Sequence, residues 1–130
     1  MPKILTIVFG RFDNAGVKNH KNIPFEKFIE VKKFSRNNEQ GCYRFVGAVL
    51  HNGNTLKSGH YTTVAQISGG KYYYFNDRDV NEIYWTDLKK FEKESYILFY
   101  EKLNDSTAVA TAHTGLKVAL SSTKLSTKSA

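Results

Sequence analysis

Cysteine is almost absent from this chain of 130 residues, in which Cys42 is the single example. One cysteine excludes an internal disulfide and fits a reducing compartment. It also cannot build a cysteine-type zinc site, and the four histidines (His20, His51, His60 and His113) show no metal-ligand spacing. We therefore expect neither a bound metal nor another cofactor.

Long apolar runs are also missing. No segment approaches the roughly 20 apolar residues that cross a bilayer, and the run from Ile4 to Phe9 is too short for a signal-peptide core. No glycine-rich motif that cradles phosphate is present either. We expect a soluble protein of the cytoplasm or nucleus, with no membrane partner.

Acidic residues are fewer than basic ones, and the formal net charge is +7. The basic residues are nevertheless dispersed along the chain, and Lys32-Lys33 and Lys89-Lys90 are isolated doublets. Nucleic-acid-binding domains gather their basic residues in a continuous patch or stripe. We therefore expect the charge to favour solubility and predict no nucleic-acid partner.

The composition divides the chain into two parts. Residues 1–103 hold all the aromatic residues and predict one folded domain, whereas residues 104–130 are rich in Ser, Thr, Ala and Lys. A segment of that composition buries too little apolar surface to offset its conformational entropy. We expect residues 104–130 to form a disordered tail.

Aromatic and β-branched residues dominate the first part, which predicts strands more than helices. Thr86 or Asp87 is placed to cap one short helix through Lys93, with Leu88 and Phe91 on one face. The fold class expected is therefore α+β, a mostly antiparallel sheet with one short helix. The strands expected are residues 3–9, 43–50, 60–67, 71–75 and 95–100, with 52–58 as a loop.

Two polar residues, His60 and Asn76, stand on strands joined by a glycine-containing turn. A two-residue turn at Gly69-Gly70 would pair Thr63 with Asn76, and strand alternation would then put His60 and Asn76 on opposite faces. A three-residue turn beginning at Ser68 instead pairs Thr62 with Asn76, which brings His60 onto the same face at diagonal distance. A joint site therefore requires the longer turn.

A histidine held by an amide is suited to thiol chemistry. An imidazole can take up and release a proton, so His60 suits a general base. Asn76 offers a carbonyl that orients the ring, and Asp77 offers a negative charge or could bind a water near the site. Structural alternatives stay open, because a single histidine on a sheet is often a packing residue and Asn-Asp often makes a turn. Cys42 follows Gly41 at the mouth of a strand, whereas reactive thiolates usually sit at a helix start. We do not expect Cys42 to be the nucleophile.

These motifs together resemble the histidine box of ubiquitin-specific proteases. The similarity runs over about residues 2–102 and rests on several ordered segments. These are the strand ending in Arg11-Phe12, Ile23-Pro24-Phe25, His51 with Gly53, Gly59-His60-Tyr61, Phe75-Asn76-Asp77, and residues 96–100. The resemblance implies the palm-like β half of a papain-like cysteine protease.

The resemblance also implies roles for individual residues. His60 would be the general base, Asn76 the orienting residue and Asp77 an auxiliary acid. Gly59, Tyr61 and His51 would belong to the substrate-binding residues, the first two lining a channel for the Gly-Gly end of ubiquitin. The segments 35–41 and 52–58 resemble the two loops that flank that tail.

The family's cysteine box, which carries the thiol, should precede Met1 and has no counterpart in these residues. We therefore expect this chain to supply the His/Asn part of a deubiquitinase triad and to be inactive alone. Three explanations stay open: a truncated product, one half of a split enzyme completed by a second chain, or an inert ubiquitin-binding or interaction module. An unrelated β domain is the remaining alternative. The partner in all but the last case would be ubiquitin or a ubiquitinated protein.

Overall fold

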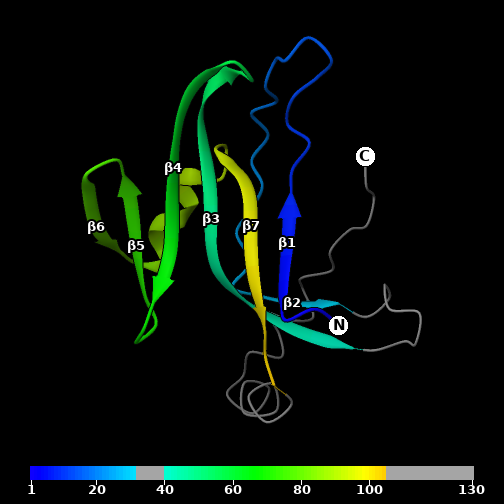
Figure 1. Cartoon of the computed structure of the whole chain (residues 1–130), viewed down its shortest axis with the longest axis vertical. Coiled ribbons are helices and arrows are strands. Elements are labelled where there is room, and N and C mark those ends of the chain that lie inside the picture. Colours follow the sequence, from blue (N-terminus) through cyan, green and yellow to red (C-terminus); the bar gives the residue numbers. More distant parts are fainter. Residues whose placement is uncertain (32–39, 105–130) are drawn as a thin grey trace. The chain divides into compact units, whose positions relative to one another are not determined.

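A computed structural model describes residues 1–31 and 40–104, and they fold mainly into antiparallel strands (Figure 1). The hydrogen-bonded strand order is β1-β7-β3-β4-β5-β6, and β2 pairs with β3. The predicted α+β class, a mostly antiparallel sheet with one short helix, is confirmed. The elements are β1 (Ile4–Val8), β2 (Phe28–Val31), β3 (Gly41–Thr55), β4 (Ser58–Ile67), β5 (Lys71–Asn76), β6 (Asp79–Ile83), the 3-10 helix η1 (Trp85–Phe91) and β7 (Ser95–Lys102).

The chain divides into two compact units. One contains Met1–Leu5, Glu26–Phe45 and the chain from Tyr100, and its described part pairs β2 and the C-terminal end of β7 with the start of β3. The buried rings of Tyr43, Phe45 and Tyr100 form its core, with Phe45 and Tyr100 packed edge to face. Edge-to-face packing is a preferred geometry for aromatic pairs.

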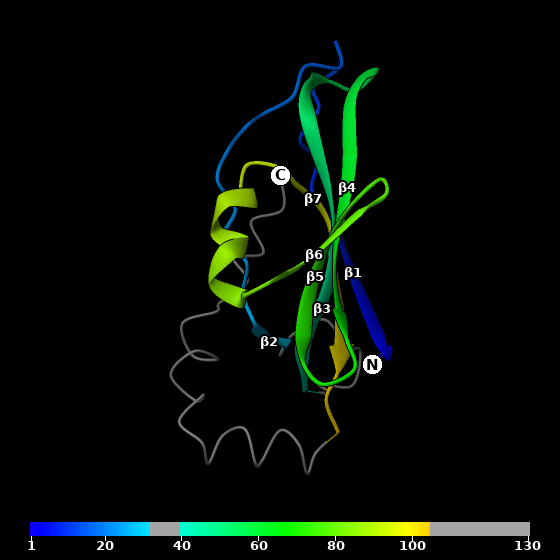
Figure 2. The same cartoon turned by 90° about the vertical axis from the view of Figure 1, so that its left-hand side faces the viewer.

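The other unit contains Thr6–Phe25 and Val46–Phe99, and its strands β4, β5 and β6 lie side by side (Figure 1). The helix η1 is set off to one side of β4 and β5 (Figure 2). The ring of Tyr74 stacks on Phe91 of η1, and Tyr72 contacts Trp85. Since Tyr72 and Tyr74 alternate with outward residues on β5, one face of this hairpin is covered by η1.

A buried arginine ties distant segments of this second unit together. The guanidinium of Arg11 donates hydrogen bonds to the backbone carbonyls of Asn19, Lys21, Glu92 and Ser95, and to Ser95 Oγ. The residue is 3% exposed, and burial lowers the pKa of the guanidinium. Neutral acceptors therefore compensate the loss of water around this charge.

Five points of the sequence analysis need correction or concern residues outside the described part of the chain. The segment 52–58 is not a loop, since β3 continues to Thr55 and β4 begins at Ser58. The strand β6 was not predicted, and the short helix ends at Phe91 rather than Lys93. Residues 35–39 of the other expected loop, and the predicted disordered tail beyond residue 104, lie outside the described residues.

Candidate active site

The turn between β4 and β5 sets the geometry of the site. Ile67 pairs with Lys71 and Thr63 with Phe75, so three residues form the loop, which is the longer of the two turns that the sequence left open. Gly69 and Gly70 both have positive φ, 88° and 77°, which a glycine adopts at little cost. The same register places the next pair at Thr62 and Asn76, and His60 therefore shares the face of Asn76.

The side chains of His60 and Asn76 meet across this hairpin. The distance from His60 Nε2 to Asn76 Oδ1 is 2.6 Å. An amide oxygen can only accept, so Nε2 carries the proton and donates it, and Nδ1 keeps a free lone pair. This arrangement fixes one tautomer of the ring and leaves its other nitrogen available to a reacting group.

Asp77 lies beside the same imidazole and turns the chain into β6. Its Oδ2 is 3.8 Å from His60 Nε2, while its φ of 52° belongs to the two-residue loop that pairs Asn76 with Asp79. Its side chain is 78% exposed, so water screens much of its attraction to the ring. Asp77 thus forms part of the turn and also places a negative charge near the ring, whose attraction to the ring is weakened by water.

The other three expected site residues, His51, Gly59 and Tyr61, lie around a contact between His51 and Tyr61. His51 pairs with Tyr61 in the β3–β4 register, and alternation places both on the face opposite to His60. Tyr61 is 49% exposed, but the side chain of His51 is buried, with its ring centroid 4.9 Å from that of Tyr61. Gly59 is exposed and has a φ of 136°. The structure therefore brings His60, Asn76 and Asp77 together and places His51 and Tyr61 apart from them.

His51 sits in a cluster of rings and charges that the sequence did not predict. Phe12 packs edge to face on His51 and also on Tyr96. The buried ammonium of Lys18 donates to the carbonyl of His51. Phe12 belonged to a matched motif and could have been suspected, whereas nothing in the sequence marks Lys18 as a neighbour of this histidine.

The electrostatics favour a neutral His51. Burial lowers its pKa from 6.5, and Lys18 lowers it further, while the backbone of Ser58 acts weakly in the other direction. That backbone group lies outside hydrogen-bond geometry, because neither ring nitrogen of His51 has a partner among the described residues. The ring is therefore held by packing rather than by polar contacts.

Cys42 lies in the other unit, on β3 opposite Glu30. Burial raises the pKa of its thiol, and Glu30 raises it further, against a weaker opposite effect of the Tyr43 backbone. A raised pKa keeps the thiol protonated at neutral pH, and the thiolate is the nucleophilic form. The environment of Cys42 is therefore the reverse of the one that activates a nucleophile.

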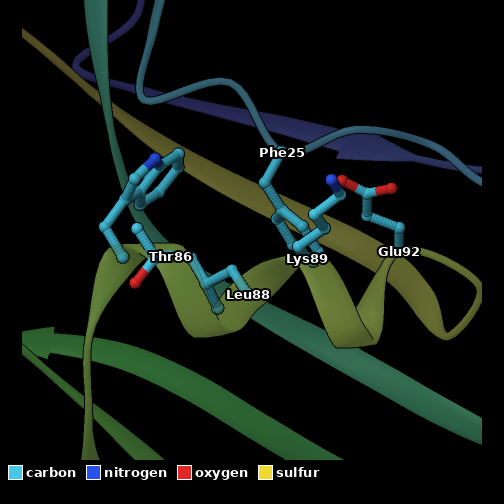
Figure 3. Close-up of a pocket in the computed structure, with 6 residues that line it drawn as sticks. Phe25, Thr86, Leu88, Lys89 and Glu92 are labelled. Atoms are coloured by element: carbon cyan, nitrogen blue, oxygen red, sulfur yellow. The ribbon is translucent and has the colours of Figure 1, made fainter.

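A shallow hollow of about 300 Å³ lies along η1, and Phe25 reaches toward the helix at its rim (Figure 3). Its lining residues are Phe25, Trp85, Thr86, Leu88, Lys89 and Glu92. None of them belongs to the His60–Asn76 pair, so the hollow is separate from the candidate chemistry. In residues 1–31 and 40–104 no cluster of three or more metal-binding side chains occurs, and no helix is long and apolar enough to span a membrane.

Comparison with known proteins gives a consistent family. Curated relatives include "Ubiquitin carboxyl-terminal hydrolase 36" of Drosophila ananassae, 32% identical over 90% of this chain and 11% of its own length. Another is "Ubiquitin carboxyl-terminal hydrolase 8" of Saccharomyces cerevisiae, 30% identical over 77% of this chain and 24% of its own length. The chain therefore spans a quarter or less of the length of these relatives.

Solved structures agree with the sequence relatives. A chain of the yeast SAGA DUB module matches with a TM-score of 0.69 at 29% identity, covering 80% of this chain and 24% of that one. The Ubp8/Sgf11/Sus1/Sgf73 module bound to ubiquitin aldehyde matches with a TM-score of 0.65 at 26% identity, over 80% of this chain and 25% of that one. The family described as "Ubiquitin carboxyl-terminal hydrolase" matches residues 1–100. The chain therefore belongs to the ubiquitin carboxyl-terminal hydrolase family.

Proposed function

We propose that this chain supplies the histidine base and its orienting amide to a thiol-dependent deubiquitinase, which hydrolyses the bond after the C-terminal glycine of ubiquitin. The observation that carries the proposal is the 2.6 Å contact between His60 Nε2 and Asn76 Oδ1. The thiol would come from residues outside this chain, because the thiol of Cys42 has a raised pKa. Ubiquitin or a ubiquitinated protein is the proposed partner, in the cytoplasm or nucleus.

Each group has a definite part in this reaction. Nδ1 of His60 takes the proton of the attacking thiol and returns it to the leaving amine, after which it activates the water that hydrolyses the thioester. Asn76 accepts the hydrogen bond from Nε2 and keeps the ring in the reactive tautomer. Asp77 adds electrostatic support to the imidazolium at 3.8 Å. The Asn76 amide carries no charge. Among the described residues, the carboxylate of Asp77 is therefore the only negative charge beside the His60 ring.

The substrate side of the proposal concerns Gly59 and Tyr61. Gly59 exposes its backbone directly before His60, and a glycine permits close approach of an extended peptide. Tyr61 exposes part of its ring on the other side of the strand. We assign Gly59 to the peptide channel and Tyr61 to its rim, whereas the burial of His51 removes it from substrate contact.

A chimera tests the proposal directly. Residues 1–103 of this chain would replace the matching segment of the Saccharomyces cerevisiae relative, and hydrolysis of a fluorogenic ubiquitin C-terminal amide would be measured. We expect turnover that falls to background in His60→Ala, with ubiquitin binding retained. A folded chimera that binds ubiquitin and turns over equally with and without His60 would contradict the proposal.

The alternative is an inert ubiquitin-binding or interaction module. Titration of the full chain with labelled ubiquitin separates the two readings. Binding by the chain, together with a chimera that never turns over, would support the inert module.

A further inference from the structure

His51 occupies an unusual position relative to the proposed base. It is one residue before Asn52, which pairs directly with His60 across β3 and β4. Its side chain is 1% exposed, and neither of its ring nitrogens has a hydrogen-bond partner among the described residues. Burying an imidazole without hydrogen-bond partners costs folding free energy. The contribution of the His51 ring to the structure is therefore its packing against neighbouring atoms.

The ring packs against the backbone of Gly59. A Cβ built on Gly59 would lie 2.6 Å from His51 Nε2 and 3.0 Å from Cε1. A Cβ on Gly53 would lie 3.1 Å from the same Cε1. The His51 ring therefore lies directly against Gly59, the residue that precedes His60. An added Cβ would also meet backbone, the Asn52 carbonyl at 2.6 Å from Gly59 and the Ser58 carbonyl at 2.7 Å from Gly53.

The ring is itself held from several directions. Phe12 and Tyr61 contact it, with ring centroids 5.3 Å and 4.9 Å away. The amide of His51 donates to the Glu94 carbonyl at 2.8 Å, and Lys18 donates to the His51 carbonyl. An anchored ring can act as a rigid support for a neighbouring strand, because packed interiors transmit small shifts.

We propose that His51 is a positioning residue for His60: its ring supports the Gly59 backbone and so fixes the point from which His60 reaches Asn76. The inference rests on the proposed function, in which the His60–Asn76 pair performs the chemistry. A displacement of a catalytic group by about 1 Å can cost about a hundredfold in rate. The role is one of shape, so an apolar ring of similar size should replace the imidazole.

The experiment reads the tautomer of His60 in the full chain. Nitrogen-15-labelled histidine would be followed by long-range 15N–1H NMR spectra of the wild type and of His51→Ala, His51→Val and His51→Phe. We expect wild-type His60 to be fixed as the Nε2–H tautomer. His51→Ala and His51→Val, which remove the ring, should both give averaged tautomers, whereas His51→Phe should keep the fixed one.

Val49→Ala serves as the matched control, because Val49 lies on the same strand and the same face, two residues before His51. This variant should leave the His60 tautomer fixed. A fixed tautomer in folded His51→Ala would overturn the inference. If His51→Ala does not fold, the smaller truncation His51→Val decides: an averaged tautomer supports the inference and a fixed one overturns it.

The failure of the proposed function is distinguishable from the failure of this inference. In one outcome, the His60 tautomer depends on the ring at position 51 but the chimera never hydrolyses ubiquitin substrates. That outcome would support the positioning role of His51 and contradict the catalytic role of His60. A wild-type His60 without a fixed tautomer would overturn both. A fixed tautomer unaffected at position 51, with a turning-over chimera, would overturn the positioning role alone.

Discussion

At the scale of single residues, the distinction between orientation and charge at the site can be measured. Asn76→Ala removes the acceptor of the 2.6 Å contact, so the ring loses its fixed tautomer. We expect kcat of the chimera to fall about a hundredfold, the usual cost of a misplaced catalytic group. Asn76→Asp keeps an acceptor oxygen in the same place and should retain most of the activity.

The control for this pair is Asp79→Ala, which removes an exposed carboxylate just after the turn. It should leave kcat within a factor of two or so, because the backbone pairing of Asp79 with Asn76 does not need this side chain and water screens an exposed charge. Equal kcat values for Asn76→Ala and the wild type would show that Asn76 does not orient the base.

Arg11 makes a stability prediction of a different kind. Arg11→Ala leaves four backbone carbonyls, those of Asn19, Lys21, Glu92 and Ser95, without this donor. The Glu92 carbonyl keeps the Ile23 amide as a donor, and Asn19 and Lys21 are exposed residues whose carbonyls can bind water, so the cost falls mainly on the buried Ser95 carbonyl. A buried unsatisfied polar group costs about 1–3 kcal/mol, and we expect the free energy of unfolding to fall by about that amount. Urea denaturation checks this value, and the exposed Arg78→Ala is the control, with a change within about 0.5 kcal/mol.

The lowered pKa of His51 predicts a pH dependence of stability. Burial and Lys18 lower the folded-state pKa below the ordinary value of 6.5, so the unfolded chain binds the proton more readily. The stability of the folded chain is therefore complete above about pH 6.5 and decreases as the pH falls below it. Thermal melts of wild type and His51→Phe should diverge in that acidic range, and parallel curves would argue that His51 is not the group responsible.

At the scale of elements, the three-residue turn decides whether a site exists at all. Deletion of Lys71 would keep the three-residue loop but pair Ile67 with Tyr72, a shift of β5 by one position that moves Asn76 to the face opposite His60. The same shift would turn the buried Tyr72 outward, so stability should fall as well. Cross-strand NOEs between Val64 and Tyr74, which pair in the present register, should disappear.

Lys71→Ala is the length-preserving control for that deletion. It keeps three residues in the loop and both glycines, so the Val64–Tyr74 NOEs and the His60 tautomer should remain. Persistence of these NOEs in the deletion variant would mean that a bulge restores the register, and that the loop length alone does not specify the site.

The same elements show what the sequence could predict. Alternating apolar residues and two glycines predicted the β4–β5 hairpin but left its register open between two turn lengths. The packing of Tyr72 and Tyr74 on η1 favours the register that is observed, because a shift by one position would turn both rings away. The extension of β3 to Thr55 and the strand β6 were missed, because both are polar and exposed and carry no hydrophobic period. The pairing of Val17 with Thr55 was equally invisible, since long-range backbone bridges leave no local pattern.

The candidate site also has features that the sequence could predict and features that it could not. His60 and Asn76 could be predicted to meet only on the condition of a three-residue turn, because turn length and strand parity together decide which faces they share. The burial of His51 could not be predicted, because it depends on Phe12 and Lys18 packing onto β3 from a distant segment. Side-chain environments of this kind follow from tertiary packing, which a single sequence does not display.

At the scale of the whole molecule, the remaining question is whether the chain carries its own nucleophile. Its only cysteine, Cys42, has a thiol pKa raised by burial and by Glu30, so little thiolate forms at neutral pH. Cys42→Ser should therefore leave the turnover of the chimera unchanged, while His60→Ala abolishes it. The isolated chain should hydrolyse the fluorogenic ubiquitin amide at the background rate, and an electrophilic ubiquitin probe should not label it. Covalent labelling of the isolated chain that is lost in Cys42→Ser would instead make Cys42 the nucleophile, because a carbon–sulfur bond to the probe requires an accessible thiolate.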